Sequence, residues 1–310
     1  MSKVPLSIAI LGPGGVGGLV GAVMARAGSA VEILAGDDTA RVIARSGIHV
    51  DSVRFGRFTM SAHAYSRMTR PVDVCLIAVK ATQLEQAMDR VPPYVLGRGL
   101  LVPLLNGIDH VALLRERYPA TSVVPATIRI ESTRIRPGAI RQTSPFAAIA
   151  IADSREHHGR LEHMVAELKT AGFDAQLCAD ETAMLWNKLA FLVPLALLTT
   201  HARTTAGVIR TEYRPDMLAV IAEVAAVAEA EGAKIDESAV VALLDSVPET
   251  MESSMQRDEI VGGPLELEAI GGAVIRHGKS SRIPVPVTKR LVDEIRVRIL
   301  SARRGLTGPH

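Results

Sequence analysis

The segment Ile8–Gly17 has the sequence IAILGPGGVG and carries most of the information about the fold. Its first four residues are apolar, which predicts a buried strand, and Val16–Ala27 has the apolar spacing of a helix. The glycines between them follow the pattern G-x-G-x-x-G. The first glycine permits a tight turn, the second lets the backbone approach a pyrophosphate, and the third lets the helix and the strand pack closely.

This context predicts a dinucleotide-binding loop, because the free N–H groups at the start of a helix bind phosphates. The alternative is an ordinary glycine-rich turn between a strand and a helix. The residues predicted to bind the cofactor are Gly12, Pro13, Gly14, Gly15, Val16 and Gly17.

Strands and helices alternate beyond this loop. The apolar runs Val31–Leu34, Val72–Val79 and Gly99–Leu105 are predicted strands. Val72–Val79 is apolar almost throughout, which is typical of a strand covered on both faces of a parallel sheet. Helical patterns between the strands then predict right-handed crossovers. The segment Ile48–Met60 alternates in the manner of a hairpin around Arg54–Gly56.

The character of the chain changes near residue 180. Val123–Ile130 and Ala139–Ala152 are predicted strands, and Phe173–Cys178 is the last of them. Almost everything that follows has helical periodicity, except Gly305–His310, which we expect to be disordered. We therefore predict an α/β fold, with a Rossmann-type N-terminal domain over residues 1–178 and an all-helical C-terminal domain over residues 179–310.

Composition excludes several classes of function. The 310 residues include 48% hydrophobic and only 3% aromatic residues, and their formal net charge is +2. Nucleic-acid binding needs a concentrated basic surface or stacking platforms, so we expect no nucleic-acid partner. The longest uncharged apolar stretch, Leu189–Leu198, contains Pro194 and is too short to span a bilayer. We expect a cytoplasmic protein with no membrane partner, and no metal site, because the histidines lack ligand-like spacing.

The sequence leaves the choice between NAD and NADP open. An acidic residue after the second strand binds the ribose of NAD, and Asp37 lies slightly late for that role. Arg41 is close enough to meet a ribose 2′-phosphate instead. Either residue could also be an ordinary charge on a solvated loop.

With these residues in view, the chain resembles the 2-dehydropantoate 2-reductase (ketopantoate reductase) family over nearly its whole length. Each matching motif is short, but their order and spacing agree. The matching motifs are the glycine loop, Val79-Lys80, Asn106-Gly107, Trp186-Asn187-Lys188-Leu189, Ser253-Ser254-Met255, Asp258, and Glu266-Leu267-Glu268 before Gly271.

The resemblance implies NADPH-dependent reduction of a 2-keto acid. It places Lys188 as the catalytic lysine that protonates the developing alkoxide, and Glu266 as the catalytic-site glutamate that holds the substrate hydroxyl. It places Ser254 at the substrate carboxylate, Asn106 beside both nicotinamide and substrate, and Lys80 near the cofactor. A cation aimed at the ketone oxygen stabilises the charge that develops there during hydride transfer.

Without the resemblance, each of these residues can be explained by an ordinary structural role. Lys188 could extend to the surface from a helix end, and Glu266 could lie at a helix N-terminus, where the helix dipole stabilises an acidic side chain. Ser254 could lie on a helix surface, Asn106 in an Asn-Gly turn, and Lys80 at a strand boundary.

The chain departs from the family where the substrate binds. The family carries asparagines four and eight residues after the lysine, and here those positions are Leu192 and Ala196. Gly36 replaces a basic residue at the end of the second strand, and Leu105 replaces a glutamine. Without the hydrogen bonds of the two asparagines, the site discriminates less strongly between ketopantoate and other 2-keto acids.

The first candidate reaction is reduction of 2-dehydropantoate to pantoate in pantothenate biosynthesis. One alternative is a dehydrogenase of the same architecture acting on another small 2-keto or 2-hydroxy acid. Another is a non-catalytic NADP(H)-binding regulatory protein. The expected partner is the small-molecule keto acid, and a homodimer is possible.

Overall fold

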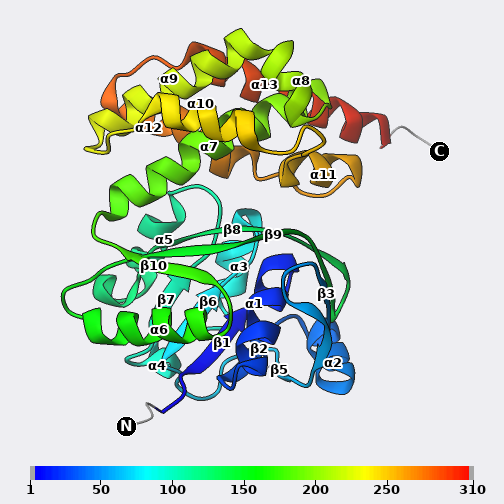
Figure 1. The fold of residues 1–310 in the computed structure, drawn as a ribbon, viewed down its shortest axis with the longest axis vertical. Coiled ribbons are helices and arrows are strands. Elements are labelled where there is room, and N and C mark those ends of the chain that lie inside the picture. Colours follow the sequence, from blue (N-terminus) through cyan, green and yellow to red (C-terminus); the bar gives the residue numbers. More distant parts are fainter. Residues whose placement is uncertain (1–3, 307–310) are drawn as a thin grey trace. The chain divides into compact units, whose positions relative to one another are not determined.

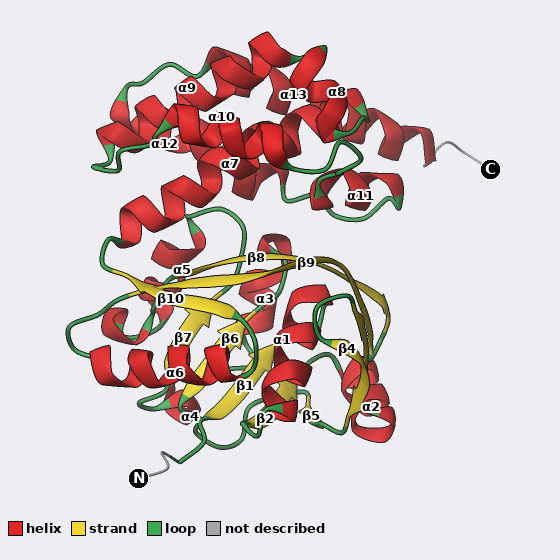
Figure 2. Cartoon of the chain, in the orientation of Figure 1, coloured by secondary structure: helices red, strands yellow, loops and turns green. Residues whose placement is uncertain are grey.

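The computed structural model describes residues 4–306 and divides the chain into two compact units. One unit, here the α/β unit, contains the residues up to Leu105 and His110–Met184. The other, here the helical unit, contains Asn106–Asp109 and the residues from Leu185 onward. The described strands all belong to the α/β unit, and the helical unit is built from helices and loops (Figure 2). The predicted fold class is confirmed, whereas the domain boundary at residue 178 stays a prediction.

A five-stranded parallel sheet forms the centre of the α/β unit (Figure 1). Its strands run in the order β5-β2-β1-β6-β7. They are β1 (Ser7–Leu11), β2 (Ala30–Leu34), β5 (His63–Tyr65), β6 (Val74–Ile77) and β7 (Leu100–Pro103). The chain first adds strands on one side of β1 and then on the other, so the switch point lies between β1 and β6. Open α/β sheets bind their ligands at the carboxyl ends of the strands at such a point.

Both faces of this sheet are buried. Ile8 and Ile10 of β1 belong to one hydrophobic cluster, whereas Ala9 and Leu11 belong to a second cluster. Successive side chains of a strand point to opposite faces, so one strand contributes to both cores. The helices and 3₁₀ turns of this unit are α1 (Gly15–Arg26), α2 (Asp37–Ser46), η1 (Ala81–Gln83), α3 (Leu84–Met88), α4 (Pro93–Leu96), α5 (His110–Arg117), η2 (Ala120–Ser122) and α6 (His158–Thr170).

A second sheet, which the sequence did not reveal as separate, completes the α/β unit. Its strands run in the order β10-β9-β3-β4, and β8 also pairs with β9. They are β3 (Ile48–Ser52), β4 (Gly56–Met60), β8 (Ala126–Arg136), β9 (Ala139–Ala152) and β10 (Asp174–Cys178). The antiparallel β3–β4 pair confirms the predicted hairpin. Strand partners far apart in sequence depend on tertiary packing, which local patterns do not report.

Apart from Asn106–Asp109, the helical unit begins within α7 (Glu181–Ala202), which contains Pro194. By length and composition α7 could cross a membrane, but 61% of its most apolar window is buried, as in a core helix. Gly305 and Leu306, expected to be disordered, lie in the last helix, and residues 307–310 are outside the described part. The other helices are α8 (Ala206–Thr211), α9 (Arg214–Ala230), α10 (Glu237–Ser246), α11 (Ser254–Ile260), the π-helical turn η3 (Glu268–Gly272), α12 (Ala273–Ser281) and α13 (Pro286–Leu306).

Candidate active site

The glycine loop follows β1 at the switch point of the sheet. Gly12 has a φ of +91°, which disfavours any side chain, and a Cβ there would lie 2.5 Å from Val79 Cγ1. A Cβ on Gly17 would overlap the carbonyl oxygen of Gly12 and lie 2.9 Å from Ala78 Cβ. The loop after β1 therefore packs directly against the segment after β6.

The loop has the features that a dinucleotide requires. A Cβ on Gly14 would meet no atom within 4 Å, so the backbone faces open space at the N-terminus of α1. Gly14 supplies no side-chain cap, and the first turn of α1 contains no acidic residue. The first N–H groups of a helix have no partner within it and attract phosphate oxygens. The start of α1 thus suits a pyrophosphate, and the roles of the individual cofactor residues stay predictions.

Gly15 has a packing role that the motif does not indicate. A Cβ on Gly15 would overlap the carbonyl oxygen of Ser132 in β8. The second sheet therefore approaches the start of α1 closely. No side chain larger than the hydrogen atom of glycine fits at position 15. Lys80 is half-buried and is the N-cap of η1, directly after Val79. It follows β6 at the edge of the sheet where Gly12 follows β1, and its role near the cofactor stays a prediction.

Two arginines lie near the end of β2. Arg41 is exposed on α2 and forms an ion pair with Asp38. Arg90 was not singled out by the sequence, because it follows α3 far along the chain. Its Nη1 donates to Ala35 O at 3.0 Å and to Ser66 O at 2.7 Å. Its Nη2 lies 3.8 Å from the position of a Cβ on Gly36, so a cation stands beside the glycine that replaces the expected basic residue.

The helical unit brings two predicted substrate residues together. Asn106 Nδ2 donates a hydrogen bond of 3.0 Å to Glu266 Oε2, although 160 positions separate the two residues. Glu266 is buried and directly precedes the helical segment that contains the π-helical turn η3. Such turns occur frequently at functional sites. Lys188 is half-buried on α7, two residues after the buried Trp186.

The two serines at the start of α11 have different environments. Ser253 is the buried N-cap, and its Oγ accepts a hydrogen bond of 3.1 Å from the N–H of Gln256. Its Oγ also lies 2.8 Å from Thr199 Oγ1. Ser254, the predicted substrate residue, is exposed at the first position of the helix. Ser253 therefore stabilises the helix, and the exposed hydroxyl of Ser254 is the one suited to a ligand.

The two apolar replacements on α7 differ in burial. Leu192 is half-buried, whereas Ala196 is completely buried. Leu192 is therefore the position of the two that can alter the polarity of a binding surface.

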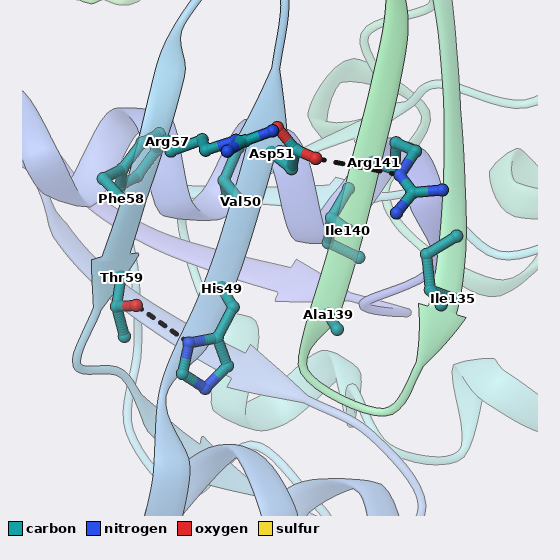
Figure 3. Close-up of a pocket in the computed structure, with 10 residues that line it drawn as sticks. All are labelled: His49, Val50, Asp51, Arg57, Phe58, Thr59, Ile135, Ala139, Ile140 and Arg141. Carbon is teal, nitrogen blue, oxygen red and sulfur yellow. Dashed lines mark hydrogen bonds and ion pairs between the residues drawn. The ribbon is translucent and has the colours of Figure 1, made fainter.

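An open concavity of about 460 Å³ lies elsewhere, on the exposed face of the second sheet (Figure 3). Its charged side chains pair with one another, since Arg57 Nε donates to Asp51 Oδ1 at 2.9 Å and Arg141 Nε lies 3.8 Å from Asp51 Oδ2. None of its lining residues is a predicted site residue, and we assign it no catalytic role.

A parallel sheet with a glycine loop that suits a dinucleotide, followed by a helical unit, defines the class of Rossmann-type dinucleotide-binding proteins. Comparison with known families identifies one family over both parts of the chain. The family model "Ketopantoate reductase PanE/ApbA" matches residues 8–156, and "Ketopantoate reductase PanE/ApbA C terminal" matches residues 180–298. The chain belongs to the ketopantoate reductase family, whose members are oxidoreductases.

Individual relatives match over most of the chain. The 2-dehydropantoate 2-reductase of Mycobacterium tuberculosis is 27% identical over 291 residues, which cover 92% of this chain and 95% of that protein. The structure of 2-dehydropantoate 2-reductase from Geobacter metallireducens has a TM-score of 0.86 at 25% identity, covering 94% of this chain and 100% of that one. D-mandelate dehydrogenase with NADH and anilino(oxo)acetate has a TM-score of 0.88 at 19% identity, covering 96% and 99%, and shares the fold.

Proposed function

We propose that this protein reduces a 2-keto acid with NADPH, and that ketopantoate is its substrate. The hydrogen bond between Asn106 and Glu266 is the observation that supports this proposal most. This hydrogen bond brings together two side chains to which the family resemblance assigns substrate binding. A buried carboxylate beside an amide is suited to hold a hydroxyl group, because the carboxylate accepts a hydrogen bond from the hydroxyl while the amide supplies an N–H donor.

In the proposed mechanism, the loop Gly12–Gly17 would hold a nicotinamide dinucleotide, which would supply the hydride for the 2-keto carbon. Lys188 donates a proton to the ketone oxygen as negative charge develops there, so that the product is a neutral hydroxyl. Glu266 accepts a hydrogen bond from the terminal hydroxyl of the substrate, and Ser254 donates one to its carboxylate. Asn106 orients the substrate through its amide. Lys188, Asn106, Ser254 and Glu266 belong to the helical unit, whereas the glycine loop belongs to the α/β unit.

We further propose NADPH rather than NADH, with Arg90 as the cation for the 2′-phosphate. Arg90 is held by two backbone carbonyls and lies beside Gly36, where the family has a basic residue. A fixed guanidinium is well suited to phosphate oxygens. The carboxylates of Asp37 and Asp38, in the first turn of α2, would oppose binding of the negatively charged 2′-phosphate. Arg41 forms an ion pair with Asp38, which makes it less suited than Arg90 to bind the phosphate.

Replacing Arg90 with glutamine is expected to raise the KM for NADPH by about 10- to 100-fold, since a charge-assisted bond contributes about 1.5–3 kcal/mol. The KM for NADH should stay nearly the same. Arg41→Gln is the matched comparison, and it separates the two candidate arginines. Equal losses with NADH and NADPH would show that Arg90 only stabilises the loop. Greater loss in Arg41→Gln would transfer the role to Arg41.

The proposed activity is tested by following NADPH oxidation by the purified protein with ketopantoate and with 2-keto acids that lack the terminal hydroxyl. Efficient turnover of ketopantoate, with much weaker turnover of the others, is the expected result. The half-buried Leu192 favours a second candidate function, reduction of a 2-keto acid with an apolar side chain. Preference for such acids would select this alternative. NADPH binding without turnover of any keto acid would favour a regulatory protein.

A further inference from the structure

The short loop Asn106–Asp109 connects β7 to α5, yet it belongs to the helical unit. Gly107 has a φ of +83°, and a Cβ there would overlap the carbonyl oxygen of Ala269 in η3. The loop therefore lies directly against the π-helical turn that follows Glu266. This close approach is the local setting of the Asn106–Glu266 hydrogen bond.

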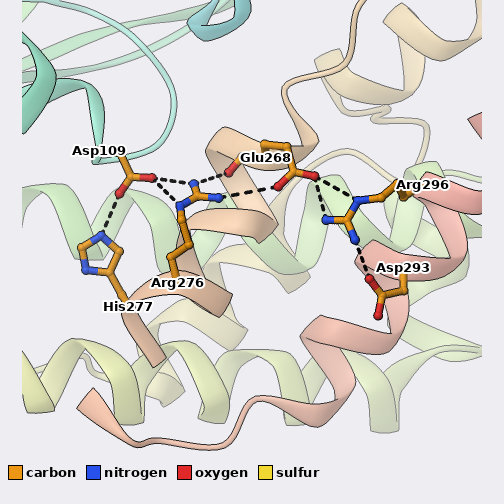
Figure 4. Close-up of polar contacts among 6 residues, drawn as sticks. All are labelled: Asp109, Glu268, Arg276, His277, Asp293 and Arg296. Carbon is orange, nitrogen blue, oxygen red and sulfur yellow. Dashed lines mark hydrogen bonds and ion pairs between the residues drawn. The ribbon is translucent and has the colours of Figure 1, made fainter. Parts of the chain in front are cut away.

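Asp109 ties the far end of this loop to α12 (Figure 4). Its Oδ2 accepts hydrogen bonds from Arg276 Nη2 at 2.5 Å and from Arg276 Nε at 3.1 Å. Arg276 Nη2 also donates to the carbonyl oxygen of Glu268 at 2.7 Å. One guanidinium therefore holds both the loop that carries Asn106 and the turn that follows Glu266.

His277 forms a second tie. Its Nε2 lies 2.7 Å from Asp109 Oδ1, and its Nδ1 hydrogen-bonds the carboxylate of Glu231 at the end of α9. The uncharged indole of Trp186 on α7 meets the imidazole edge to face, with ring centroids 5.6 Å apart. The charged groups around His277 are thus Asp109 and Glu231, with Arg276 on the other side of Asp109.

Both nitrogens of His277 can donate only when the ring is an imidazolium. The hydrogen bond to Asp109 raises the pKa of His277, burial opposes this, and Glu231 raises it further. Burial acts to raise the pKa of Asp109, but the bonds from His277 and Arg276 outweigh it, so that pKa is lowered. Both directions favour the ion-paired form of the cluster.

We propose that Asp109, Arg276 and His277 are positioning residues that hold Asn106 against Glu266 and thereby determine the affinity for the keto acid. This rests on the proposed function for its substrate. None of the three residues is assigned a contact with substrate. They act through the loop that carries Asn106 and through the π-helical turn that follows Glu266.

The cluster also predicts a pH dependence. Below the pKa of His277 both carboxylates receive a hydrogen bond. As the pH rises through that pKa, the neutral ring keeps one donor and turns a lone pair towards the other carboxylate. The tie is therefore complete at lower pH and weakens above the raised pKa. The KM for the keto acid should increase over that range.

The test compares Asp109→Asn and His277→Gln with the wild type. Asp109→Asn should lower kcat/KM for the keto acid about 10- to 100-fold, mainly through KM, because misplaced binding groups have effects of this size. The dissociation constant of NADPH, measured by fluorescence, should not change. His277→Gln should abolish the pH step in the keto-acid KM and give a flat profile.

Asp216→Asn is the matched control, since Asp216 accepts a 2.8 Å hydrogen bond from Arg290 in the same unit. It should leave the keto-acid KM unchanged. The inference is overturned if Asp109→Asn behaves like this control, or if His277→Gln keeps the wild-type pH profile. A general loss of stability would affect both aspartate variants.

An NMR measurement separates failure of this inference from failure of the proposed function, because it needs no substrate. The side-chain amide signals of Asn106 should shift in Asp109→Asn and stay in place in Asp216→Asn. The imidazole of His277 should titrate above the ordinary value of about 6.5 in the wild type and nearer to it in Asp109→Asn. If these signals are unaffected, the positioning role is wrong whether or not the wild type turns over a keto acid.

Discussion

Replacing Lys188 with alanine is expected to lower kcat for keto-acid reduction by about 10³-fold, while the dissociation constant of NADPH changes little. The ketone oxygen becomes negatively charged as the hydride arrives. Without the ammonium group of Lys188, neither a stabilising positive charge nor a proton is supplied to that oxygen. Because this interaction exists mainly in the transition state, kcat should fall more than KM rises. Steady-state kinetics with saturating NADPH measures the effect.

Two further variants make this result specific. Lys279→Ala removes an exposed lysine of α12 in the same unit and should keep the wild-type rate. Lys188→Arg retains a positive charge but is a poor proton donor, because arginine stays protonated in proteins. A large loss in Lys188→Arg would therefore indicate proton transfer, and partial activity would indicate electrostatic stabilisation. If Lys188→Ala retains the full rate, another group donates the proton.

Replacing Gly14 with alanine is expected to weaken dinucleotide binding by about 100-fold, because loss of one or two charge-assisted bonds costs about 1.5–3 kcal/mol each. The added methyl group would project into the open space at the N-terminus of α1, where the pyrophosphate is proposed to bind. It would meet no protein atom within 4 Å, so the protein should remain folded. Fluorescence titration with NADPH and thermal unfolding measure the two effects separately.

Gly17→Ala provides the contrasting variant. Its methyl group would overlap the carbonyl oxygen of Gly12 and crowd Ala78, so the free energy of unfolding should fall by about 1–3 kcal/mol. Unchanged binding in Gly14→Ala, with the protein folded, would contradict the assignment of the pyrophosphate to this loop. Equal destabilisation in both variants would show that Gly14 serves packing alone.

Much of the α/β unit was predictable because its signals are local. The strand–glycine loop–helix segment and the hairpin at Arg54–Gly56 both have short-range patterns, and both predicted features are present. The pairing of β9 with β3 and β10 was not predictable, since it joins segments far apart in the chain. Gly15 illustrates the difference, because its contact with Ser132 depends on where β8 lies.

The candidate site divides in the same way. Lys80, Asn106, Lys188, Ser254 and Glu266 were predicted from motifs, and their roles stay predictions. Arg90, Asp109 and His277 were missed, because hydrogen bonds and ion pairs between distant segments leave no spacing signal in one sequence. The two carboxylate partners of His277 lie 46 and 168 positions away in the chain, so no local pattern indicates them.

The amino-acid sequence alone was sufficient for the α/β-then-helical order, the dinucleotide loop and the family resemblance. These depend on backbone conformations and apolar periodicities that neighbouring residues control. The approach of Arg90 to Gly36, the docking of the Asn106–Asp109 loop on η3 and the pairing of Asn106 with Glu266 required the tertiary structure. Hydrogen bonds and charge pairs have short ranges, so which of them form depends on how the folded chain brings distant segments within a few ångströms.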